Sequence, residues 1–463
     1  MSIMKEVHMN NPLVLNQKLL LTIKRIGING EGIGYYKRLA VFVPNSLVGE
    51  EVEVQITKLE DKYAYGEVVK FKKISPHRVS PRCPFYGKCG GCQLQHLDYQ
   101  EQLVQKRNIV VEAFERYYNG DVEKIKIYDT VGMANPWNYR NKTQLPTRHD
   151  GESVVVGIYA LDSNKLVFID ECLIENELIT QAMKEILAYL TKANIDVYNP
   201  RYKQGSLRYI VLRGLESTNE IQATFVLFKN DKRLIKALEG IIKIANIKSV
   251  SYTINSDPKA IEIINGKIEL VAGKDKIAGK LGDLDFDISP DSFLQLNSEQ
   301  TIKLYDLVVQ AMKPDGTENV LDCYCGIGSI GLYAAKYVKE LRGIDNNRAN
   351  IENAKEFAKK NNIENAKFYF GDILPHLHNF EKEGYNIDTL IIDPPRKGME
   401  LNIINYLQKS KIKKIIYVSC NPSTLVKNLN HLQKAYDIRF VKPVDMFPHT
   451  ANVETVVLLS RKK

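Results

Sequence analysis

The last third of the chain alternates strand-like and helix-like segments, and this alternation limits the possible folds more than any other feature. Residues 320–338, VLDCYCGIGSIGLYAAKYV, predict a strand, a glycine-rich loop and a helix. Further strand-like runs occupy 341–345, 366–372 and 389–393, with a helix-like run at 350–363. Strands that alternate with helices form parallel sheets. We therefore predict an α/β domain with a doubly wound sheet over residues 286–463.

A cysteine follows the fifth strand of this domain. Residues 414–425, KIIYVSCNPSTL, contain a β-branched and aromatic run that predicts a buried strand, and Pro422 marks the start of a helix. Cys420 then lies in the strand-to-helix turn, at the edge where open α/β sheets bind ligands. A thiol there can be a nucleophile, although cysteine is also common in cores. Two final runs, 438–448 and 454–463, predict a closing antiparallel hairpin.

Composition and length predict a globular protein of several domains. The chain has 463 residues, of which 44% are hydrophobic and 26% charged, which excludes a disordered polymer. No apolar run reaches the roughly 18 residues of a membrane span, and the amino terminus lacks the apolar region of a signal peptide. We therefore expect a cytoplasmic location. The net charge of +9 permits a polyanionic partner, and we expect a monomer without an obligate protein partner.

Residues 14–72 predict a small β-barrel. Short alternating segments are separated by glycine turns such as Asn29-Gly30. Basic and aromatic side chains are interleaved, which suits contacts with phosphates and bases but equally fits a solvated strand face. These side chains are Lys24, Arg25, Tyr35, Tyr36, Lys37 and Arg38.

Three cysteines on a loop rich in proline and glycine predict a metal site. Cys83, Cys89 and Cys92 are spaced C-x5-C-x2-C, and soft thiolates this close favour a soft metal. A tetrahedral site needs a fourth ligand. Cys172 is the only other cysteine outside the last third of the chain, so it completes the set by elimination. Spacing alone leaves structural zinc and an iron-sulfur cluster equally open.

Residues 73–285 predict a central α+β domain that carries this cysteine site. Strand-like and helix-like runs alternate less regularly here than in the last domain. Four basic residues are candidate RNA contacts, although a solvated surface position is the better account of any single one of them. They are Arg140, Lys142, Arg208 and Arg213.

The glycine loop of the last domain has two interpretations. Gly326, Gly328 and Gly331 fit the G-x-G-x-x-G pattern of nicotinamide cofactors, with Asp345 at the end of the second strand. However, an acid, Asp322, precedes the loop where that fold is normally apolar, and it suits the ammonium of a methionine moiety. The fourth strand ends in Asp393, Pro394 and Pro395, a pattern of S-adenosylmethionine enzymes that act on planar bases. We therefore favour a Rossmann-like domain that binds S-adenosylmethionine.

Several motifs in order carry a specific resemblance. FLQLN (293–297), DCYCGIGSIG (322–331), IIDPPRKG (391–398), VSCNPSTL (418–425) and DMFPHTANVE (445–454) follow the barrel and the cysteine loop. This series resembles the bacterial RNA (uracil-5-)-methyltransferase family of the 23S ribosomal RNA type, over nearly the whole chain. Asp345 and Asn452 depart from the family, in which many members carry Glu and His.

The resemblance implies a role for each motif. The barrel resembles the TRAM RNA-binding module, and the four cysteines resemble ligands of a 4Fe-4S cluster. Cys420 corresponds to the nucleophile and Glu454 to the base, on a 23S rRNA substrate. Matching positions for the S-adenosylmethionine site are Gln295, Tyr324, Asp345 and Asp393.

The expected chemistry explains these residue types. Carbon 5 of uracil becomes nucleophilic when a thiolate adds to carbon 6, and a base must then remove the carbon 5 proton. We expect the amino terminus of the following helix to lower the pKa of Cys420. A flipped or single-stranded uridine is required, held against an aromatic such as Phe293.

Three alternatives stay open on sequence grounds. The same chemistry could act on a tRNA uridine. An exocyclic amino methylase also uses an acid or amide before two prolines, but an aromatic normally follows them where Arg396 stands here. A non-catalytic, metal-containing RNA-binding protein would not need Cys420, Glu454 and Asp393 together.

Overall fold

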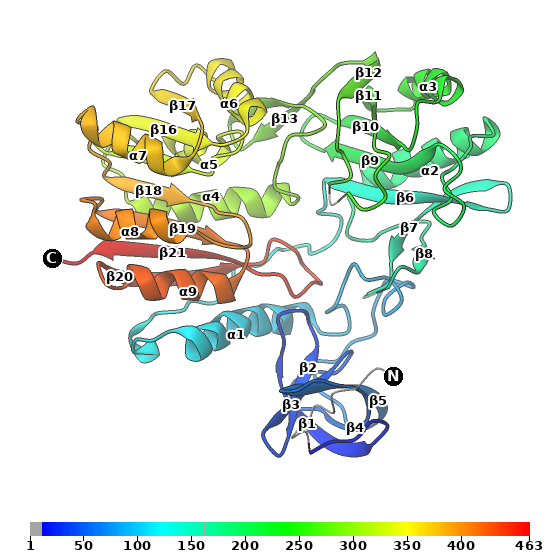
Figure 1. The fold of residues 1–463 in the computed structure, drawn as a ribbon, viewed down its shortest axis with the longest axis horizontal. Coiled ribbons are helices and arrows are strands. Elements are labelled where there is room, and N and C mark those ends of the chain that lie inside the picture. Colours follow the sequence, from blue (N-terminus) through cyan, green and yellow to red (C-terminus); the bar gives the residue numbers. More distant parts are fainter. Residues whose placement is uncertain (1–11, 162, 261) are drawn as a thin grey trace, which may run out of the picture.

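The computed structural model describes residues 12–161, 163–260 and 262–463, which form a barrel, a central sheet and a larger α/β unit (Figure 1). The barrel contains β1 (Lys18–Ile26), β2 (Gly32–Tyr36), β3 (Leu39–Val43), β4 (Glu51–Leu59) and β5 (Tyr63–Lys73). These strands close in the order β1-β2-β3-β5-β4, which confirms the predicted small barrel. Alternate side chains such as Val52, Val54 and Ile56 fill its interior.

The turn between β1 and β2 reaches beyond the barrel. Gly30 has a φ of 92°, and a Cβ there would lie 2.6 Å from Cβ of Gln93 and 3.4 Å from Cβ of Ala451. Glycine is needed for both the backbone conformation and this close approach. The predicted Asn29-Gly30 turn therefore packs between the cysteine loop and the segment before Glu454.

The central unit is a mixed sheet of order β12-β11-β10-β9-β6-β7-β8. Only the pairing of β10 with β11 is parallel among its neighbouring strands. The apolar faces of α2 and α3 join the buried core of this sheet, as the predicted α+β pattern requires. Its elements are β6 (Lys142–Asp150), β7 (Ser153–Tyr159), β8 (Leu166–Phe168), α2 (Glu177–Lys192), β9 (Leu207–Leu215), β10 (Glu220–Leu227), α3 (Lys232–Leu238), the 3-10 helix η2 (Glu239–Lys243), β11 (Ile247–Ile254) and β12 (Ile268–Gly273). A hairpin of β13 (Ile277–Leu281) and β14 (Leu284–Ile288) leads to the last unit.

The last unit has a seven-stranded sheet of order β17-β16-β15-β18-β19-β21-β20. The first five of these are parallel neighbours, and β21 runs antiparallel to both β19 and β20, which confirms the predicted closing hairpin. Its elements are α4 (Ser298–Met312), β15 (Asn319–Cys323), α5 (Ser329–Ala335), β16 (Glu340–Asp345), α6 (Arg348–Lys360), β17 (Ala366–Phe370), α7 (Ile373–Lys382), β18 (Thr389–Ile392), α8 (Leu401–Lys409), β19 (Lys414–Ser419), α9 (Pro422–Leu432), β20 (Tyr436–Val444) and β21 (Glu454–Arg461).

Helices cover both faces of this sheet. Along β19, Ile415 and Tyr417 join the core beneath α7, α8 and α9, whereas Ile416 and Val418 join the core beneath α4, α5 and α6. This alternation is the period of a strand buried on both sides, and it explains the continuous apolar run in the sequence.

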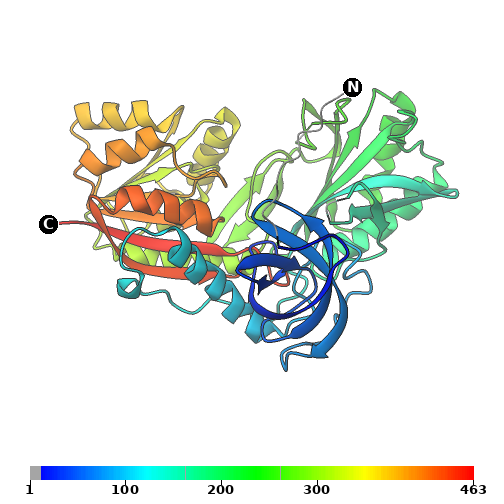
Figure 2. The ribbon, with the colours of Figure 1, turned by 60° about the horizontal axis from the view of Figure 1, so that its bottom comes forward.

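Helix α1 (Tyr99–Tyr117) links the cysteine loop to the last unit and lies between that unit and the barrel in two views (Figures 1 and 2). Asp98 caps it by accepting a hydrogen bond from the backbone N of Glu101. Its Val110 and Phe114 are buried with residues of α9 and β20. The short 3-10 helix η1 (Val122–Lys124) follows, and residues 127 and 131 then bridge to β20.

Within residues 12–161, 163–260 and 262–463, no helix is both long and apolar enough to cross a bilayer. The expected domain limits at 14–72, 73–285 and 286–463 stay predictions.

Candidate active site

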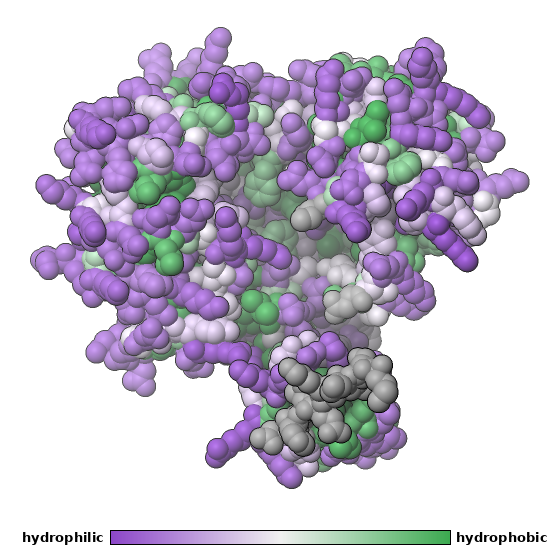
Figure 3. Space-filling model, in the orientation of Figure 1, coloured by the Kyte–Doolittle hydropathy of each residue, from purple (hydrophilic) through white to green (hydrophobic). Residues whose placement is uncertain are grey.

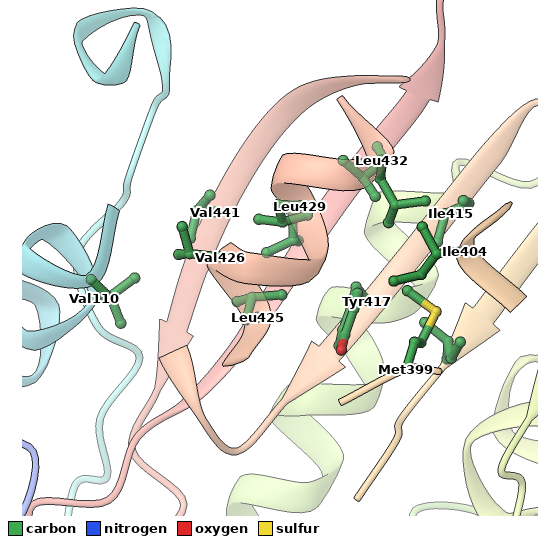
Figure 4. Close-up of a cluster of buried hydrophobic side chains, with 14 of the residues drawn as sticks. Val110, Met399, Ile404, Ile415, Tyr417, Leu425, Val426, Leu429, Leu432 and Val441 are labelled. Carbon is green, nitrogen blue, oxygen red and sulfur yellow. The ribbon is translucent and has the colours of Figure 1, made fainter. Parts of the chain in front are cut away.

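Cys420 lies in the turn between β19 and α9, as the sequence predicts. Asn421 caps the helix by accepting hydrogen bonds from the backbone N atoms of Ser423 and Thr424, at 3.1 and 3.3 Å, and Pro422 occupies the first turn. The apolar face of α9, with Leu425 and Leu429, packs over β19 (Figure 4). The thiol is therefore fixed at the carboxyl edge of the sheet.

Asn428 of α9 ties three segments together behind this turn. Its Oδ1 accepts hydrogen bonds from the Tyr417 hydroxyl and from the backbone N of Met399, each 2.8 Å long. A Cβ on Gly398 would lie 2.5 Å from the same oxygen. The loop after Asp393 is thereby held against α9, and nothing local in the sequence signals this role of Asn428.

Burial raises the pKa of the Cys420 thiol to about 11, and the nearby carboxyls of Glu454 and Asp393 contribute to the increase. The net change in the pKa of Cys420 is therefore an increase, opposite to the expected lowering, and the contribution of the helix amino terminus stays a prediction. Arg396, on the exposed loop after the two prolines, acts in the opposite direction. Arg396 thus supplies positive charge that favours a thiolate here. In the sequence analysis, Arg396 was noted only because it stands where exocyclic amino methylases normally carry an aromatic residue.

Glu454 is the first residue of β21 and is only 6% exposed. Burial raises its pKa to about 8, Asp393 contributes, and Arg396 opposes the increase. Burial likewise raises the pKa of Asp393 to about 7. The structure thus brings Cys420, Asp393 and Glu454 within electrostatic reach of one another, with Arg396 beside the thiol and Glu454.

The segment 445–453, which precedes Glu454, is held by side chains from distant parts of the chain; we call it the catalytic loop. Lys106 of α1 pairs with Asp445 and donates to the carbonyl of Phe447 at 3.0 Å. Gln102 accepts from the backbone N of His449 at 3.0 Å. Trp137 stacks on the His449 ring at a centroid distance of 3.8 Å.

The cysteine loop and α4 also hold the catalytic loop. The backbone N atoms of Gln93 and Leu94 donate to the carbonyl of His449, at 3.0 and 2.8 Å. Gln300 donates to the carbonyl of Asp445 at 2.8 Å. Sequence reasoning missed this network, because its partners, such as Gln102 and His449 with a separation of 347 residues, lie far apart in the chain.

Two acids lie next to the glycine loop, Asp322 in β15 and Asp345 at the end of β16. Asp322 accepts from the backbone N of Gly331 at 3.0 Å, whereas its Oδ1 is buried without a hydrogen-bond partner in the described part of the chain. Burial raises its pKa to about 8. Asp345, at the end of β16, accepts from the backbone N of Gly326 at 2.9 Å. A buried carboxyl with one unpartnered oxygen fits the ammonium of S-adenosylmethionine, and a carboxyl at the end of the second strand fits its ribose.

Two further predicted cofactor residues lie in loops, Tyr324 between β15 and α5 and Gln295 between β14 and α4. Tyr324 follows β15 with a φ of 61°, an uncommon conformation for a residue with a side chain. Gln295 is half-buried, and its carbonyl accepts from Asn141 Nδ2 at 3.0 Å. Phe293 is 62% exposed, so its ring is free to meet a base.

The four predicted cysteine ligands line one cavity of about 230 Å³ in the central unit. The backbone N of Gly91 donates to Sγ of Cys89 at 3.3 Å. Burial raises the pKa of Cys89, raises that of Cys92 to about 11, and raises that of Cys172 further. Thiols in such surroundings ionise only beside positive charge, which a metal supplies.

This donor set fits a sulfur-ligated cluster, in which thiolates surround a body larger than one ion. Among the described residues, no three histidine, cysteine or acidic side chains converge closely enough to hold a single ion. The 4Fe-4S cluster itself therefore stays a prediction.

Two of the four predicted RNA contacts in the central unit are wrong. Arg213 is 2% exposed and donates to the carbonyls of Ser289 and Ser292, at 3.1 and 2.6 Å. Arg208 is 6% exposed and bonds to Asn255. Both guanidinium groups satisfy backbone or amide oxygens inside the protein, so neither is free to meet a phosphate.

Comparison with known proteins adds family-level information. The model of the tRNA (Uracil-5-)-methyltransferase family matches residues 98–462, and that of the TRAM domain matches residues 13–69. An uncharacterized RNA methyltransferase of Bacillus cereus is 42% identical over 454 residues, covering 97% of this chain and 98% of that protein. One from Listeria innocua is 42% identical over 457 residues, covering 98% and 99%.

A solved structure is similar over nearly the whole chain. It is the tRNA (uracil-54, C5)-methyltransferase of Pyrococcus abyssi in complex with S-adenosyl-L-homocysteine. The TM-score is 0.75 at 28% sequence identity, with 95% of this chain and 100% of that one covered.

Proposed function

Because the chain belongs to the family of S-adenosylmethionine-dependent RNA (uracil-5-)-methyltransferases, we propose that it methylates carbon 5 of a uridine in 23S ribosomal RNA through a covalent bond to Cys420. The observation that carries the covalent mechanism is the meeting of Cys420, Asp393 and Glu454 at one sheet edge. A cytoplasmic location follows from a ribosomal substrate.

Cys420 is the nucleophile in this proposal. Its sulfur forms a bond to carbon 6 of uracil, and the electrons of the double bond move to the carbonyl at carbon 4, which makes carbon 5 nucleophilic. The thiol proton passes to the carboxylate of Asp393, whose pKa of about 7 leaves a large ionised fraction at neutral pH. Arg396 favours the thiolate during this transfer.

Glu454 is the base that ends the cycle. When bound, S-adenosylmethionine supplies the methyl group that carbon 5 takes up. The Glu454 carboxylate then removes the carbon 5 proton, the double bond re-forms and the Cys420 sulfur leaves as a thiolate. Because Glu454 must be ionised to do this, Arg396, which lowers the Glu454 pKa, assists both ends of the cycle.

Four residues are proposed to hold S-adenosylmethionine, and we add Asp322 to them. Asp345 is the proposed acceptor for ribose hydroxyls, and Tyr324, Gln295 and Asp393 are proposed to contact the rest of the cofactor. Asp322 carries an unpaired buried oxygen, which supports a contact with a cationic group.

Cys83, Cys89, Cys92 and Cys172 are proposed to hold a 4Fe-4S cluster with a structural role. Support comes from their shared cavity and from the hydrogen bonds that join the cysteine loop to His449. Protein purified without oxygen should contain about four iron and four sulfide per chain. Stoichiometric zinc without sulfide would exclude the cluster.

A tRNA uridine is the second candidate substrate. The Pyrococcus enzyme with a similar structure acts on uracil 54 of tRNA, and its fold match covers nearly all of this chain. Mass spectrometric mapping of 5-methyluridine in ribosomal RNA and tRNA, from cells with and without the gene, separates the two. Loss of 5-methyluridine from tRNA alone would exclude the ribosomal assignment.

The covalent mechanism predicts opposite behaviour for two variants. Cys420→Ala should bind RNA and S-adenosylmethionine but should transfer no methyl group and form no adduct. Glu454→Gln should transfer the methyl group once and then accumulate a methylated protein-RNA adduct that survives denaturant. Radiolabel from the cofactor in a shifted gel band measures this. An adduct with Cys420→Ala, or normal turnover by Glu454→Gln, would refute the assigned roles.

A further inference from the structure

A groove of about 900 Å³ runs between the barrel and α1, and the first turn of α9 closes one end. The barrel contributes the walls from β1, β2, β3 and the start of β5, and α1 contributes the opposite side. Pro422 and Ser423 line the end, only two and three residues after Cys420 in the chain. The groove therefore reaches the start of the helix that follows the proposed nucleophile.

Aromatic rings form the barrel wall of this groove. Phe42 and Tyr63 meet edge to face at 5.3 Å between centroids, and Tyr65 lies 5.5 Å from Phe42 and 5.6 Å from Tyr63. All three rings are half-buried and line the groove, and Tyr35, which is 45% exposed, lies on the same wall. Ring surface open to a groove in an RNA enzyme suits a nucleobase, because every base has a face that stacks.

The charges in the groove are nearly balanced. Lys24, Arg25, Lys62 and Arg116 line it together with three glutamates. Arg25 and Glu112 pair across the groove at 2.8 Å between Nη1 and Oε2. A balanced set of charges does not attract a run of phosphates, so the groove favours the base of a nucleotide over its backbone.

A basic depression adjoins the groove on the outer side of α9. Its described lining is Asn119, Lys427, Asn430, His431 and Lys434, which includes no acid. Lys427 lies over the ring of Tyr117 at 5.0 Å, and Tyr117 also lines the groove. An RNA strand with one base bound in the groove could thus place its phosphates against the lysines of α9.

Figure 3 shows the molecule hollowed between its two larger lobes, with apolar side chains on the floor of the hollow. The groove is a separate feature, lined by the barrel, α1 and the start of α9. We propose that the groove binds one unpaired nucleobase that flanks the target uridine, stacked on the wall of Phe42, Tyr63 and Tyr65. This inference rests on the proposed function and specifies its substrate as RNA that is single-stranded on at least one side of the uridine.

Removal of the tyrosine rings by substitution should abolish stacking of the base and weaken RNA binding. We would measure binding of a short fluorescein-labelled single-stranded RNA containing one uridine, and of a matched duplex, by anisotropy without cofactor. Tyr63→Ala with Tyr65→Ala should weaken single-strand binding roughly fivefold to hundredfold. Tyr63→Phe keeps the ring and should bind as the wild type does. Tyr202→Ala removes a tyrosine that is 62% exposed and outside the groove, and it should have no effect.

The position of the stacked base can be measured independently of affinity, by the fluorescence of a base analogue. The same RNA with 2-aminopurine beside the uridine should lose fluorescence on binding to the wild type, and should keep it with the double variant. An unchanged affinity, or an equal loss for duplex and single strand, would overturn the proposal. A loss caused by Tyr63→Phe would do so as well, because it would assign the effect to the hydroxyl.

These measurements distinguish a failure of the groove proposal from a failure of the proposed carbon 5 methylation. Binding and fluorescence are measured without methyl transfer, so they stay readable if carbon 5 methylation fails. Conversely, the wild type could methylate RNA normally while the double variant shows an unchanged KM for RNA. This result would overturn the proposed role of the groove and leave the proposed methylation intact. A proteinaceous partner in the groove would appear as unchanged RNA binding in that variant, which also overturns the proposal.

Discussion

Helix α1 forms two polar contacts of opposite kind on its two sides. Toward the catalytic loop, the side chains of Lys106 and Asp445 pair with no exposed surface, and Tyr99 donates to Asp445 at 2.9 Å. Toward the barrel, Arg25 and Glu112 pair across the groove with 26% of each side chain exposed. Both are ion pairs between distant segments, but only the first is closed off from water.

The difference teaches that burial, not the presence of an ion pair, decides what a contact does. A buried charge without its partner is strongly unfavourable, so the inner contact fixes one arrangement of the catalytic loop. A pair open to solvent contributes little and can exchange its partner for water or a phosphate. The inner side of α1 therefore fixes the segment before Glu454, and the pair on the outer side stays open to solvent.

The largest expected effect comes from breaking the inner pair. Lys106→Met leaves Asp445 as an unpaired buried acid and should lower the free energy of unfolding by about 3–5 kcal/mol. Turnover should fall more than the affinity for S-adenosylmethionine, because the loop before Glu454 loses its anchor. Chemical denaturation and single-turnover assays measure both effects.

The double variant Lys106→Met with Asp445→Asn is the control for this prediction. It contains no uncompensated charge and should recover at least half of the lost stability. If the double variant is less stable than Lys106→Met alone, the pair is not the source of the effect.

The second effect should come from the titration of Glu454, a buried acid that, unlike Asp445, is not paired with a lysine. The pKa of Glu454 is raised to about 8, so its contribution to stability is fully present below the unfolded pKa near 4.5 and is lost as pH rises toward 8. The free energy of unfolding of the substrate-free protein should fall by up to about 1.4 kcal/mol per pH unit from this group. Melting curves of the wild type and Glu454→Gln between these pH values test this, and parallel pH profiles would contradict it.

The barrel turn that touches both the cysteine loop and the catalytic loop gives a third effect. Gly30→Ala combines a positive φ with a Cβ placed 2.6 Å from Gln93, and should cost about 1–3 kcal/mol. Gly49→Ala is a matched control, since Gly49 has a φ of 82° and no heavy atom within 4 Å in the described structure. Equal losses in thermal stability would show that backbone strain accounts for the whole effect.

The smallest effect is expected at the outer pair. Arg25→Gln should change the free energy of unfolding by less than about 1 kcal/mol, because its partner Glu112 stays hydrated. A double-mutant cycle with Glu112→Gln measures the coupling. A coupling as large as that of the inner pair would erase the contrast between the two sides of α1.

The sequence alone determined the elements and their order. The alternation after residue 320 specified the parallel sheet, the run before Cys420 specified its strand and turn, and the glycine turns specified the barrel. Each of these signals is local, because strand and helix periodicity and turn chemistry act over a few neighbouring residues. The four cysteines that the sequence analysis grouped line one cavity, whereas their role as metal ligands stays a prediction.

Only the tertiary structure decided the electrostatic surroundings. The pKa of Cys420 rises although a helix follows it, because two acids from other strands lie near it in a buried site. Arg213 serves backbone carbonyls instead of RNA, and Lys106 meets Asp445 across 339 residues. Burial and charge at a site depend on which distant segments pack there, and no local pattern carries that information.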